Sequence, residues 1–502
     1  MISKKLTLAS DVKRVLNFIK TSLGPKGMDK LMINENGEIK ITNDGSTILK
    51  NIKKDGIVVH ILNEVCSVID QEIGDGTTTL CCLVGELINE AEKLVNINIH
   101  PQVIIQGFRL AAKEAIKTIN SCSFDNSNNL ELFCADLLDI AKTTINSKIV
   151  TTQKELFSRI ALKAVLKLKG STDLNRIHII KKRGGSLKDS FLDDGFILDK
   201  SLALHQPKKV KNAKILIVNT TLDSDRIKIY GVKIKVKSIS NLARLEIGEQ
   251  KKLLDKCKKI LSHGINTVIN RQLIYNRQER FFSDHGVLTI EQVDFDGIER
   301  IALATGAEIT STFDEPSKVK LGKCKIIEEV IIGEDRCIRF GGCLNEGSCS
   351  IVLRGSSDQI LDEAERSLND TLCTLIKSIR NPKYIWGGGY AEMKINLSVE
   401  NLAKKFESKK SLSISAFSNA IKRIPEIIIE NAGLESVFLI NKFKSALQEG
   451  KEMCINIEEQ DCICSTKKSG LIENSKLKIQ IILFAVEAVE MIIRIDKMFL
   501  NC

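Results

Sequence analysis

The spacing of apolar residues changes twice along the chain. In the run that begins at Thr77, the apolar residues Leu80, Leu83, Val84 and Leu87 recur every three or four positions and would share one face of a helix. This period predicts helices over residues 10–23, which end before Gly24-Pro25, then from Thr77, from Pro101, and in two further segments up to about residue 168. The alternating residues 38–42 predict one strand in this helical part.

The middle of the chain contains short apolar runs that are typical of strands. We predict strands within residues 176–181, 213–219, 227–239 and 324–354, with helices over residues 246–263 and 296–304. The helical period then returns over residues 357–380 and 476–499. This order predicts an α/β domain inserted into a helical domain that contains both chain ends, because the termini of an inserted domain usually lie close together.

Composition restricts the class of protein. The 502 residues are 43% hydrophobic and 27% charged, as in folded chains, and the length predicts several domains. The net charge of +11 is spread along the chain, which argues against a dedicated nucleic-acid-binding protein. The sequence has no apolar run long enough to span a membrane, and its first residues do not resemble a secretory signal.

The cysteines are numerous but scattered. Most of the 15, such as Cys66, Cys81 and Cys82, lie in apolar runs, which predicts buried free thiols in a reducing compartment. The closest pair, Cys462 and Cys464, has no second pair and no histidine beside it. We therefore predict no zinc site.

Four short segments are candidates for a phosphate-binding site. In GDGTTT, residues 74–79, the helix N-terminus would offer free backbone N–H groups to an anion, and Asp75 would suit a bound Mg²⁺. An ordinary helix cap made by Asp75 or Thr77 explains this segment equally well. The other candidates, each also compatible with a simple turn or loop, are TSLGPKGMDK (residues 21–30), NDGSTIL (residues 43–49) and GGG (residues 387–389). The P-loop, dinucleotide-binding, metalloprotease and serine-hydrolase motifs are absent from the sequence.

Taken together, these segments resemble the group II chaperonins, a family that includes the ring subunits of the eukaryotic cytosolic chaperonin. The resemblance extends almost from end to end. It rests on the segments TSLGPKGMDK, NDGSTILKNI, GDGTTT, HPQVIIQGFRLA, ERSLNDTL, GGGYAEM, ENAGL and GLIENSKLKIQ.

The resemblance implies a multidomain α and α/β fold. A helical equatorial ATPase domain would comprise residues 1–132 and 384–502, and an intermediate hinge domain would comprise residues 133–204 and 355–383. The inserted α/β apical domain, residues 205–354, would carry a lid protrusion within residues 221–260 and would bind substrate through residues 296–306 and 272–280.

The resemblance also implies a site for ATP and Mg²⁺. Asp75 would hold the metal ion, while Asp44 and Asp370 would be the catalytic carboxylates that act on the attacking water. Because Asp370 would belong to the hinge domain, we expect a domain movement to bring it to the phosphate. The expected nucleotide contacts, including Lys148 at the γ-phosphate and Glu473 at the ribose, are Gly24, Pro25, Gly76, Thr77, Thr78, Thr79, Lys148, Gly388 and Glu473.

The function implied by the resemblance is that of a cytoplasmic ATPase and chaperone. The expected partners are other chaperonin subunits in two stacked rings of eight, partly folded clients such as actin and tubulin, and prefoldin, with no membrane or nucleic-acid partner. Three alternatives remain open. The chain could be a ring subunit that binds ATP with little hydrolysis, a stand-alone ATP phosphotransferase, or an RNA-binding protein, although few aromatic residues are available for base stacking.

Overall fold

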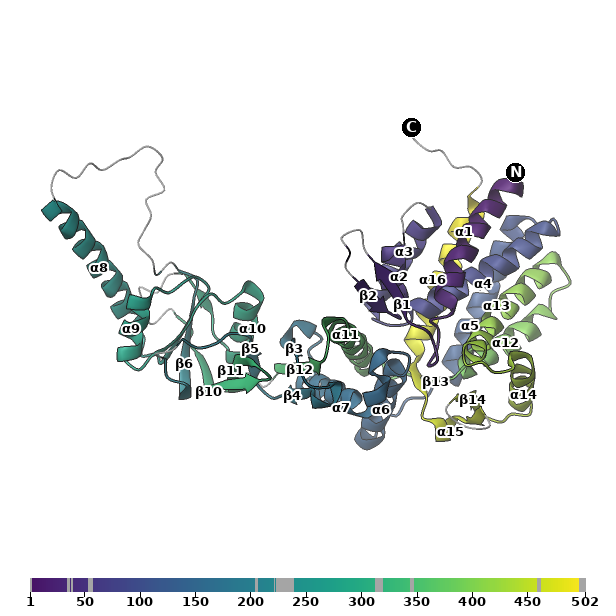
Figure 1. Ribbon diagram of the computed structural model, residues 1–502. Helices are drawn as coiled ribbons and strands as arrows, with labels where there is room; N and C mark the ends of the chain where they lie inside the picture. Colours follow the sequence, from purple (N-terminus) through teal and green to yellow (C-terminus); the bar gives the residue numbers. More distant parts are fainter. Residues whose placement is uncertain are drawn as a thin grey trace. The chain divides into compact units, whose positions relative to one another are not determined.

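The computed structural model describes residues 2–33, 37, 39–52, 57–203, 206–220, 222, 239–311, 319–343, 347–457 and 462–495. The chain forms two compact units (Figure 1). Unit 1 comprises Met1–Leu162 and Asp362–Cys502, and unit 2 comprises Lys163–Leu361. Both chain ends therefore belong to unit 1. The finer five-segment division expected from the sequence stays a prediction.

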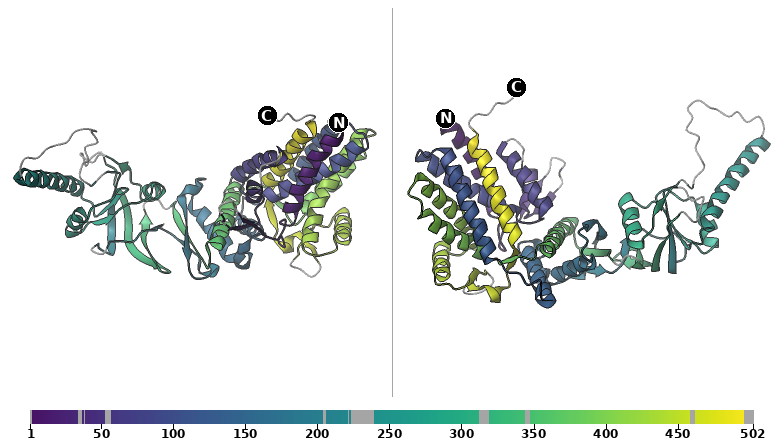
Figure 2. Two further views of the ribbon diagram at one scale, coloured as in Figure 1. Left: turned by 45° about the horizontal axis from the view of Figure 1, so that its top comes forward. Right: turned by 180° about the vertical axis from the view of Figure 1, so that it is seen from behind.

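Unit 1 is mainly helical. Its helices are α1 (Ile2–Lys20), α2 (Gly45–Asn51), α3 (Ile57–Glu72), α4 (Thr77–Asn96), α5 (Pro101–Cys122), α6 (Leu130–Ile145), α12 (Tyr390–Ala403), α13 (Lys409–Asn431), α14 (Ser436–Gln448), α15 (Thr466–Ser469) and α16 (Ser475–Arg494). Helices α4, α5, α13 and α16 lie side by side (Figures 1 and 2). Helices α7 (Lys154–Lys167) and α11 (Asp358–Arg380) each begin in one unit and end in the other.

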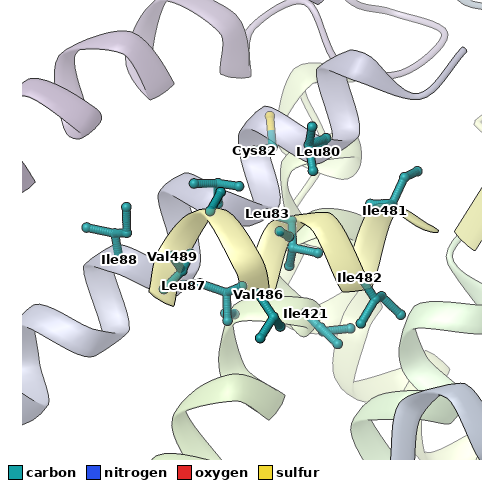
Figure 3. Close-up of a cluster of buried hydrophobic side chains, with 14 of the residues drawn as sticks. Leu80, Cys82, Leu83, Leu87, Ile88, Ile421, Ile481, Ile482, Val486 and Val489 are labelled. Atoms are coloured by element: carbon teal, nitrogen blue, oxygen red, sulfur yellow. The ribbon is translucent and has the colours of Figure 1, made fainter. Parts of the chain in front are cut away.

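The core of unit 1 fixes the start of α4 against α16. Figure 3 shows Leu83 of α4, Ile421 of α13, and Ile481 and Val486 of α16 packed together. These side chains are at most 6% exposed. Burying aliphatic side chains of this size stabilises a fold by about 1.5–3 kcal/mol each. Because α4 and α16 share this core, the residues at their N-terminal ends are held close together.

Among the described residues, unit 1 also contains three two-stranded antiparallel sheets. They pair β1 (Lys30–Ile33) with β2 (Ile39–Thr42), β13 (Tyr384–Trp386) with β16 (Ile472–Asn474), and β14 (Met453–Ile455) with β15 (Ile463–Ser465). The register of the second pair places Ile385 opposite Glu473. The glycines that follow β13 therefore lie beside Glu473.

Unit 2 contains two sheets. The larger has the order β5-β11-β10-β6-β7-β8, with β9 also paired to β6, and the smaller has the order β3-β12-β4. Their strands are β3 (Ile177–Arg183), β4 (Phe191–Asp193), β5 (Phe196–Leu198), β6 (Lys209–Val218), β7 (Thr267–Asn270), β8 (Leu288–Ile290), β9 (Ile309–Thr310), β10 (Gly322–Ile332), β11 (Asp335–Cys343) and β12 (Cys349–Gly355). Helices α8 (Ile239–Leu261), α9 (Asn276–Asp284) and α10 (Phe295–Thr305) accompany the larger sheet, and α8 extends beyond it (Figure 2).

Most predicted elements are confirmed, including the helices that begin at Thr77 and Pro101 and the strands within residues 324–354. The helix predicted over residues 10–23 is wrong at both ends, since α1 spans Ile2–Lys20. The strand predicted over residues 227–239 lies outside the described residues, except that Ile239 begins α8. The described cysteines are all free and mostly buried, as predicted. In the described part of the chain, no helix combines the length and apolar character needed to cross a membrane.

Candidate active site

A cavity in unit 1 is lined by helix ends and loops from both halves of the chain. The free space within it, together with the solvent at its open mouth, is about 1430 Å³. The lining residues with polar groups or glycine backbone include Ser22, Gly24, Asn43, Asp44, Asp75, Gly76, Thr77, Thr78, Thr79, Asn146, Lys148, Gly388, Glu392, Asn456, Glu473 and Lys478.

Asp44 caps one of the helices that end at this cavity. Its carboxylate accepts hydrogen bonds from the backbone N–H groups of Ser46 (3.2 Å) and Thr47 (3.0 Å), at the start of α2. It also accepts hydrogen bonds from the hydroxyls of Thr47 (2.7 Å) and Thr77 (2.9 Å). Burial alone would raise the pKa of Asp44, but the hydrogen bonds from Thr47 and the charge of Lys148 outweigh burial and lower it. Asp44 is therefore an ionised carboxylate in a fixed orientation.

The N-terminus of α4 meets that of α2 at the same wall. Gly76 is the residue before α4, with φ of 85°, and no side chain caps the helix. The first backbone N–H groups of α4 are thus available to an anion, and the helix dipole favours negative charge there. The interpretation in which Asp75 or Thr77 caps α4 is therefore wrong. Asp75 instead accepts a hydrogen bond from the Gly76 N–H (2.8 Å), and Thr77 donates to Asp44.

Two glycines allow the helix ends to come this close. A Cβ atom on Gly45 would lie 2.9 Å from the backbone nitrogen of Thr78, and the Gly45 N–H donates to Thr78 Oγ1 (3.2 Å). A Cβ atom on Gly76 would lie 2.9 Å from Cδ1 of Ile481, and its positive φ favours glycine in any case. The sequence G-D-G-T-T-T therefore has a structural requirement for glycine as well as a chemical one.

Lys148 and Asp370 form a buried ion pair next to these helix ends. The pKa of Asp370 is raised to about 7 by burial, which Lys148 opposes and the neighbouring carboxylates of Asp44 and Asp75 reinforce. Burial alone would lower the pKa of Lys148, but the charges of Asp370 and Asp75 raise it, so the amine stays protonated. Three carboxylates around one ammonium group leave this part of the cavity with an excess of negative charge, which suits a bound cation.

A second ionic cluster lines another part of the cavity wall. Lys478 Nζ donates to Glu473 Oε2 (2.7 Å) and to Glu392 Oε1 (2.6 Å). A Cβ atom on Gly387 would lie 2.7 Å from Glu473 Oε1, so the glycine backbone packs against this carboxylate. Burial raises the pKa of Glu473, an effect that Lys478 opposes and Glu392 reinforces.

The structure brings the predicted site residues together. Eleven of the twelve line the cavity: Gly24, Pro25, Asp44, Asp75, Gly76, Thr77, Thr78, Thr79, Lys148, Gly388 and Glu473. Asp370 contacts the cavity wall through Lys148. Asp370 and Asp44 both belong to unit 1 and are close enough to influence each other's charge, and the assignment of Asp370 to a hinge domain stays a prediction. Their roles stay predictions.

Sequence reasoning missed several cavity residues, notably Lys478, Glu392 and Asn43. Asn43 donates through Nδ2 to the backbone oxygen of Ser147 (2.9 Å) and so ties the loop before α2 to the loop that carries Lys148. Lys478 lies inside the segment GLIENSKLKIQ, and Glu392 lies inside GGGYAEM. A lysine or glutamate in a helical pattern normally faces solvent, so only their partners from other elements mark these two as site residues.

Comparison with known proteins finds relatives that match almost the whole chain. The sequence model of the TCP-1/cpn60 chaperonin family matches residues 15–501. T-complex protein 1 subunit beta of Dictyostelium discoideum is 48% identical over 485 residues, which cover 96% of this chain and 91% of that protein. The beta subunits of Arabidopsis thaliana (48% identical, 96% and 92% covered) and Homo sapiens (46% identical, 96% and 90% covered) are similarly related. Residues 177–200 and 263–276 already predicted this resemblance to the beta subunit among the eukaryotic subunits, and the relatives confirm it.

Proposed function

This chain belongs to the TCP-1/cpn60 chaperonin family, and from that premise we propose that it is an ATP-hydrolysing subunit of a chaperonin ring. Its chaperonin fold and general role follow from the family. The proposal adds that ATP binds with Mg²⁺ in the cavity of unit 1 and that hydrolysis drives closure of a double-ring chamber. The observation that carries the proposal is that two helix N-termini, Asp44, Asp75 and the Lys148–Asp370 pair meet at one cavity.

The uncapped start of α4 is the proposed phosphate-binding element. Its free N–H groups and the hydroxyls of Thr77, Thr78 and Thr79 supply donors, while Gly24 and Pro25 supply backbone along the nucleotide. Thr77 now donates to Asp44, but a hydroxyl can rotate toward a phosphate oxygen without any backbone movement. This wall can therefore exchange internal hydrogen bonds for ligand hydrogen bonds.

Asp75 is the proposed ligand of Mg²⁺. Among the described residues, no group of three or more His, Cys, Asp or Glu side chains could hold a metal ion by itself. A magnesium ion at a phosphate site needs only one or two carboxylates, because water and phosphate oxygens complete its shell. The Asp75 carboxylate lines the cavity beside the free end of α4, which fits this requirement. When bound, the ion would neutralise charge on the phosphates.

Asp44 and Asp370 are the proposed groups that act on the attacking water. Asp44 stays ionised and keeps its three hydrogen bonds from Ser46 and Thr47 when Thr77 turns toward a phosphate, so it can orient a water molecule by accepting a hydrogen bond from it. Asp370, with a pKa of about 7, can accept a proton near neutral pH. Lys148 remains charged beside it and stabilises negative charge that develops on the phosphate.

The wider role follows from the relatives, whose name describes a subunit of a T-complex protein. We propose that the chain works in the cytoplasm in two stacked rings of eight related subunits, on clients such as actin and tubulin, with prefoldin as a further partner. Helix α10 of unit 2 overlaps residues 296–306, which are expected to bind clients, and exposes Leu303 (43%) within that segment and Phe295 (56%) just before it.

ATP turnover by the complex, purified through a tag on this chain, tests the proposal. Asp370→Ala is expected to lower turnover without abolishing it, because the other subunits keep their own sites. Asp362→Ala, which changes an exposed carboxylate on the same helix, should leave turnover unchanged. Equal turnover in the wild-type and Asp370→Ala complexes would refute hydrolysis by this chain and favour a subunit that only binds ATP.

A further inference from the structure

Lys478 lies between two carboxylates at the cavity wall that contains Glu473. We propose that Lys478 is a positioning residue that holds Glu473 as the acceptor for the ribose hydroxyls and so sets the sugar specificity of this subunit. The inference rests on the proposed function, because it assumes that the cavity binds a nucleotide. It goes further by assigning a role to a residue that would itself make no contact with the sugar.

The cluster is built from three separate elements of unit 1. Lys478 is on α16, Glu473 is on β16 and Glu392 is on α12. Lys478 Nζ donates to one oxygen of each glutamate, at 2.7 Å and 2.6 Å, and the side chains of Lys478, Glu473 and Glu392 are 12%, 20% and 8% exposed. Glu473 is thus the most accessible member of the cluster, and all three side chains line the cavity.

The contacts of Glu473 leave its carboxylate little freedom. Oε2 accepts a hydrogen bond from Lys478. Oε1 lies so close to the backbone of Gly387 that a Cβ atom added to this glycine would be only 2.7 Å from it. The remaining lone pairs can accept hydrogen bonds from a ligand. A ribose offers two adjacent hydroxyl donors, and an ionised carboxylate accepts such hydrogen bonds more strongly than a neutral acceptor does.

Removing the charge of Lys478 would alter the protonation and orientation of Glu473 while leaving the Glu473 side chain in place. Glu392 and Glu473 would then lose the counter-ion they share, and like charges in a buried site favour protonation of one carboxyl group. Protonation or rotation of Glu473 would weaken the acceptor that the ribose needs. The effect should therefore be confined to nucleotides that carry ribose hydroxyls, whereas loss of folding would affect every nucleotide.

Competitive photolabelling of the full-length chain in its purified complex tests this inference. The chain is labelled with 8-azido-ATP, identified by mass, and protected with increasing concentrations of either ATP or 2′,3′-dideoxy-ATP. The variants are Lys478→Met, Lys478→Arg, and Lys478→Met combined with Glu392→Gln. Lys476→Met, at an exposed lysine two positions away on the same helix, is the matched control.

We expect ATP to protect the wild-type chain at a concentration about tenfold lower than dideoxy-ATP does. A tenfold ratio corresponds to the free energy of about one charge-assisted hydrogen bond. Lys478→Met should reduce this ratio to about 1–2 by weakening ATP alone. Lys478→Arg should keep most of the ratio, and Glu392→Gln should restore part of it in the double variant, because the repulsion between Glu473 and the charge of Glu392 is then removed. The Lys476→Met chain should behave as wild type.

Different results would refute nucleotide binding by the cavity and the positioning role of Lys478. If ATP does not reduce the labelling of the wild-type chain, the proposed nucleotide binding is refuted, and the role of Lys478 is refuted with it. Normal competition by ATP with an unchanged ratio in Lys478→Met would overturn the inference alone. A Lys478→Met chain that loses affinity for ATP and dideoxy-ATP equally would also overturn it, since that result indicates a purely structural role.

Discussion

At the scale of single residues, Asp44 and Asp370 show how carboxyl groups around one lysine acquire opposite pKa shifts. Four hydrogen bonds hold the charge of Asp44, and its pKa is lowered. Asp370 is buried, pairs with Lys148 and has two further carboxylates nearby, and its pKa is raised to about 7. One group is therefore suited to orient water and the other to accept a proton.

The raised pKa of Asp370 predicts a pH-dependent contribution to stability. Its folded-state pKa of about 7 lies above the ordinary value of 3.8, so the folded form keeps a proton that the unfolded form loses. Between about pH 4 and 7 this group should make the free energy of unfolding fall as pH rises, by up to about 1.4 kcal/mol per unit. Asp370→Asn cannot titrate and should lack this decline.

Urea unfolding of the nucleotide-free wild-type and Asp370→Asn chains at pH 5, 6 and 7 measures the difference. The expected result is that Asp370→Asn gains stability relative to wild type as pH rises. Asp362→Asn, at an exposed carboxyl on the same helix, is the control and should show no such trend. Parallel pH profiles for wild type and Asp370→Asn would contradict the raised pKa.

At the scale of elements, the close approach of α2 and α4 creates the wall that we propose binds phosphate. Gly45→Ala would place a methyl group 2.9 Å from the backbone nitrogen of Thr78. Because backbone cannot rotate away as a side chain can, the two helix ends must separate, at a cost of about 1–3 kcal/mol. We expect lower stability and a larger loss of affinity for ATP.

Gly248→Ala is a matched control for this substitution. Gly248 is also a helical glycine, in α8, but a methyl group there would meet no atom within 4 Å. This change should be neutral or stabilising by about 0.5–1 kcal/mol. Thermal unfolding and ATP titration of both variants compare the two sites, and equal behaviour would show that the helix contact has no special importance.

Local patterns predicted the elements well where the determinants are local. Helix α4 begins at Thr77 because Gly76 precedes a long amphipathic run, and α5 begins at Pro101 because a proline opens another such run. The predicted C-terminal end of the first helix was wrong because a distant residue binds the chain where α1 ends. Asn431 Nδ2 donates to the backbone oxygens of Lys20 (2.9 Å) and Leu23 (2.8 Å). In the same way, the local glycine and threonine motifs identified most of the residues that line the cavity. Lys478 could not be identified from a local motif, because its role depends on its contacts with Glu473 and Glu392, which lie on other elements.

At the scale of the whole molecule, the hydrophobic clusters of unit 2 suggest that it folds independently. Three hydrophobic clusters among the described residues lie within unit 2 and are formed between the strands of its sheets and helices α8, α9 and α10. We therefore expect a fragment of residues 170–357, which begins after α7 and ends before α11, to unfold cooperatively when expressed alone. Circular dichroism during urea titration measures this, and a gradual change without a transition would contradict independent folding.

The central claim is that this chain works as one subunit of a mixed chaperonin ring. The most direct measurement is the native mass, with identification of every chain, of a tagged copy purified from its own cells in the presence of Mg-ATP. The account predicts a complex of about sixteen subunits that contains several related chains, in which this chain is one kind among them. A monomer of 55.8 kDa, or a ring of identical chains, would contradict it.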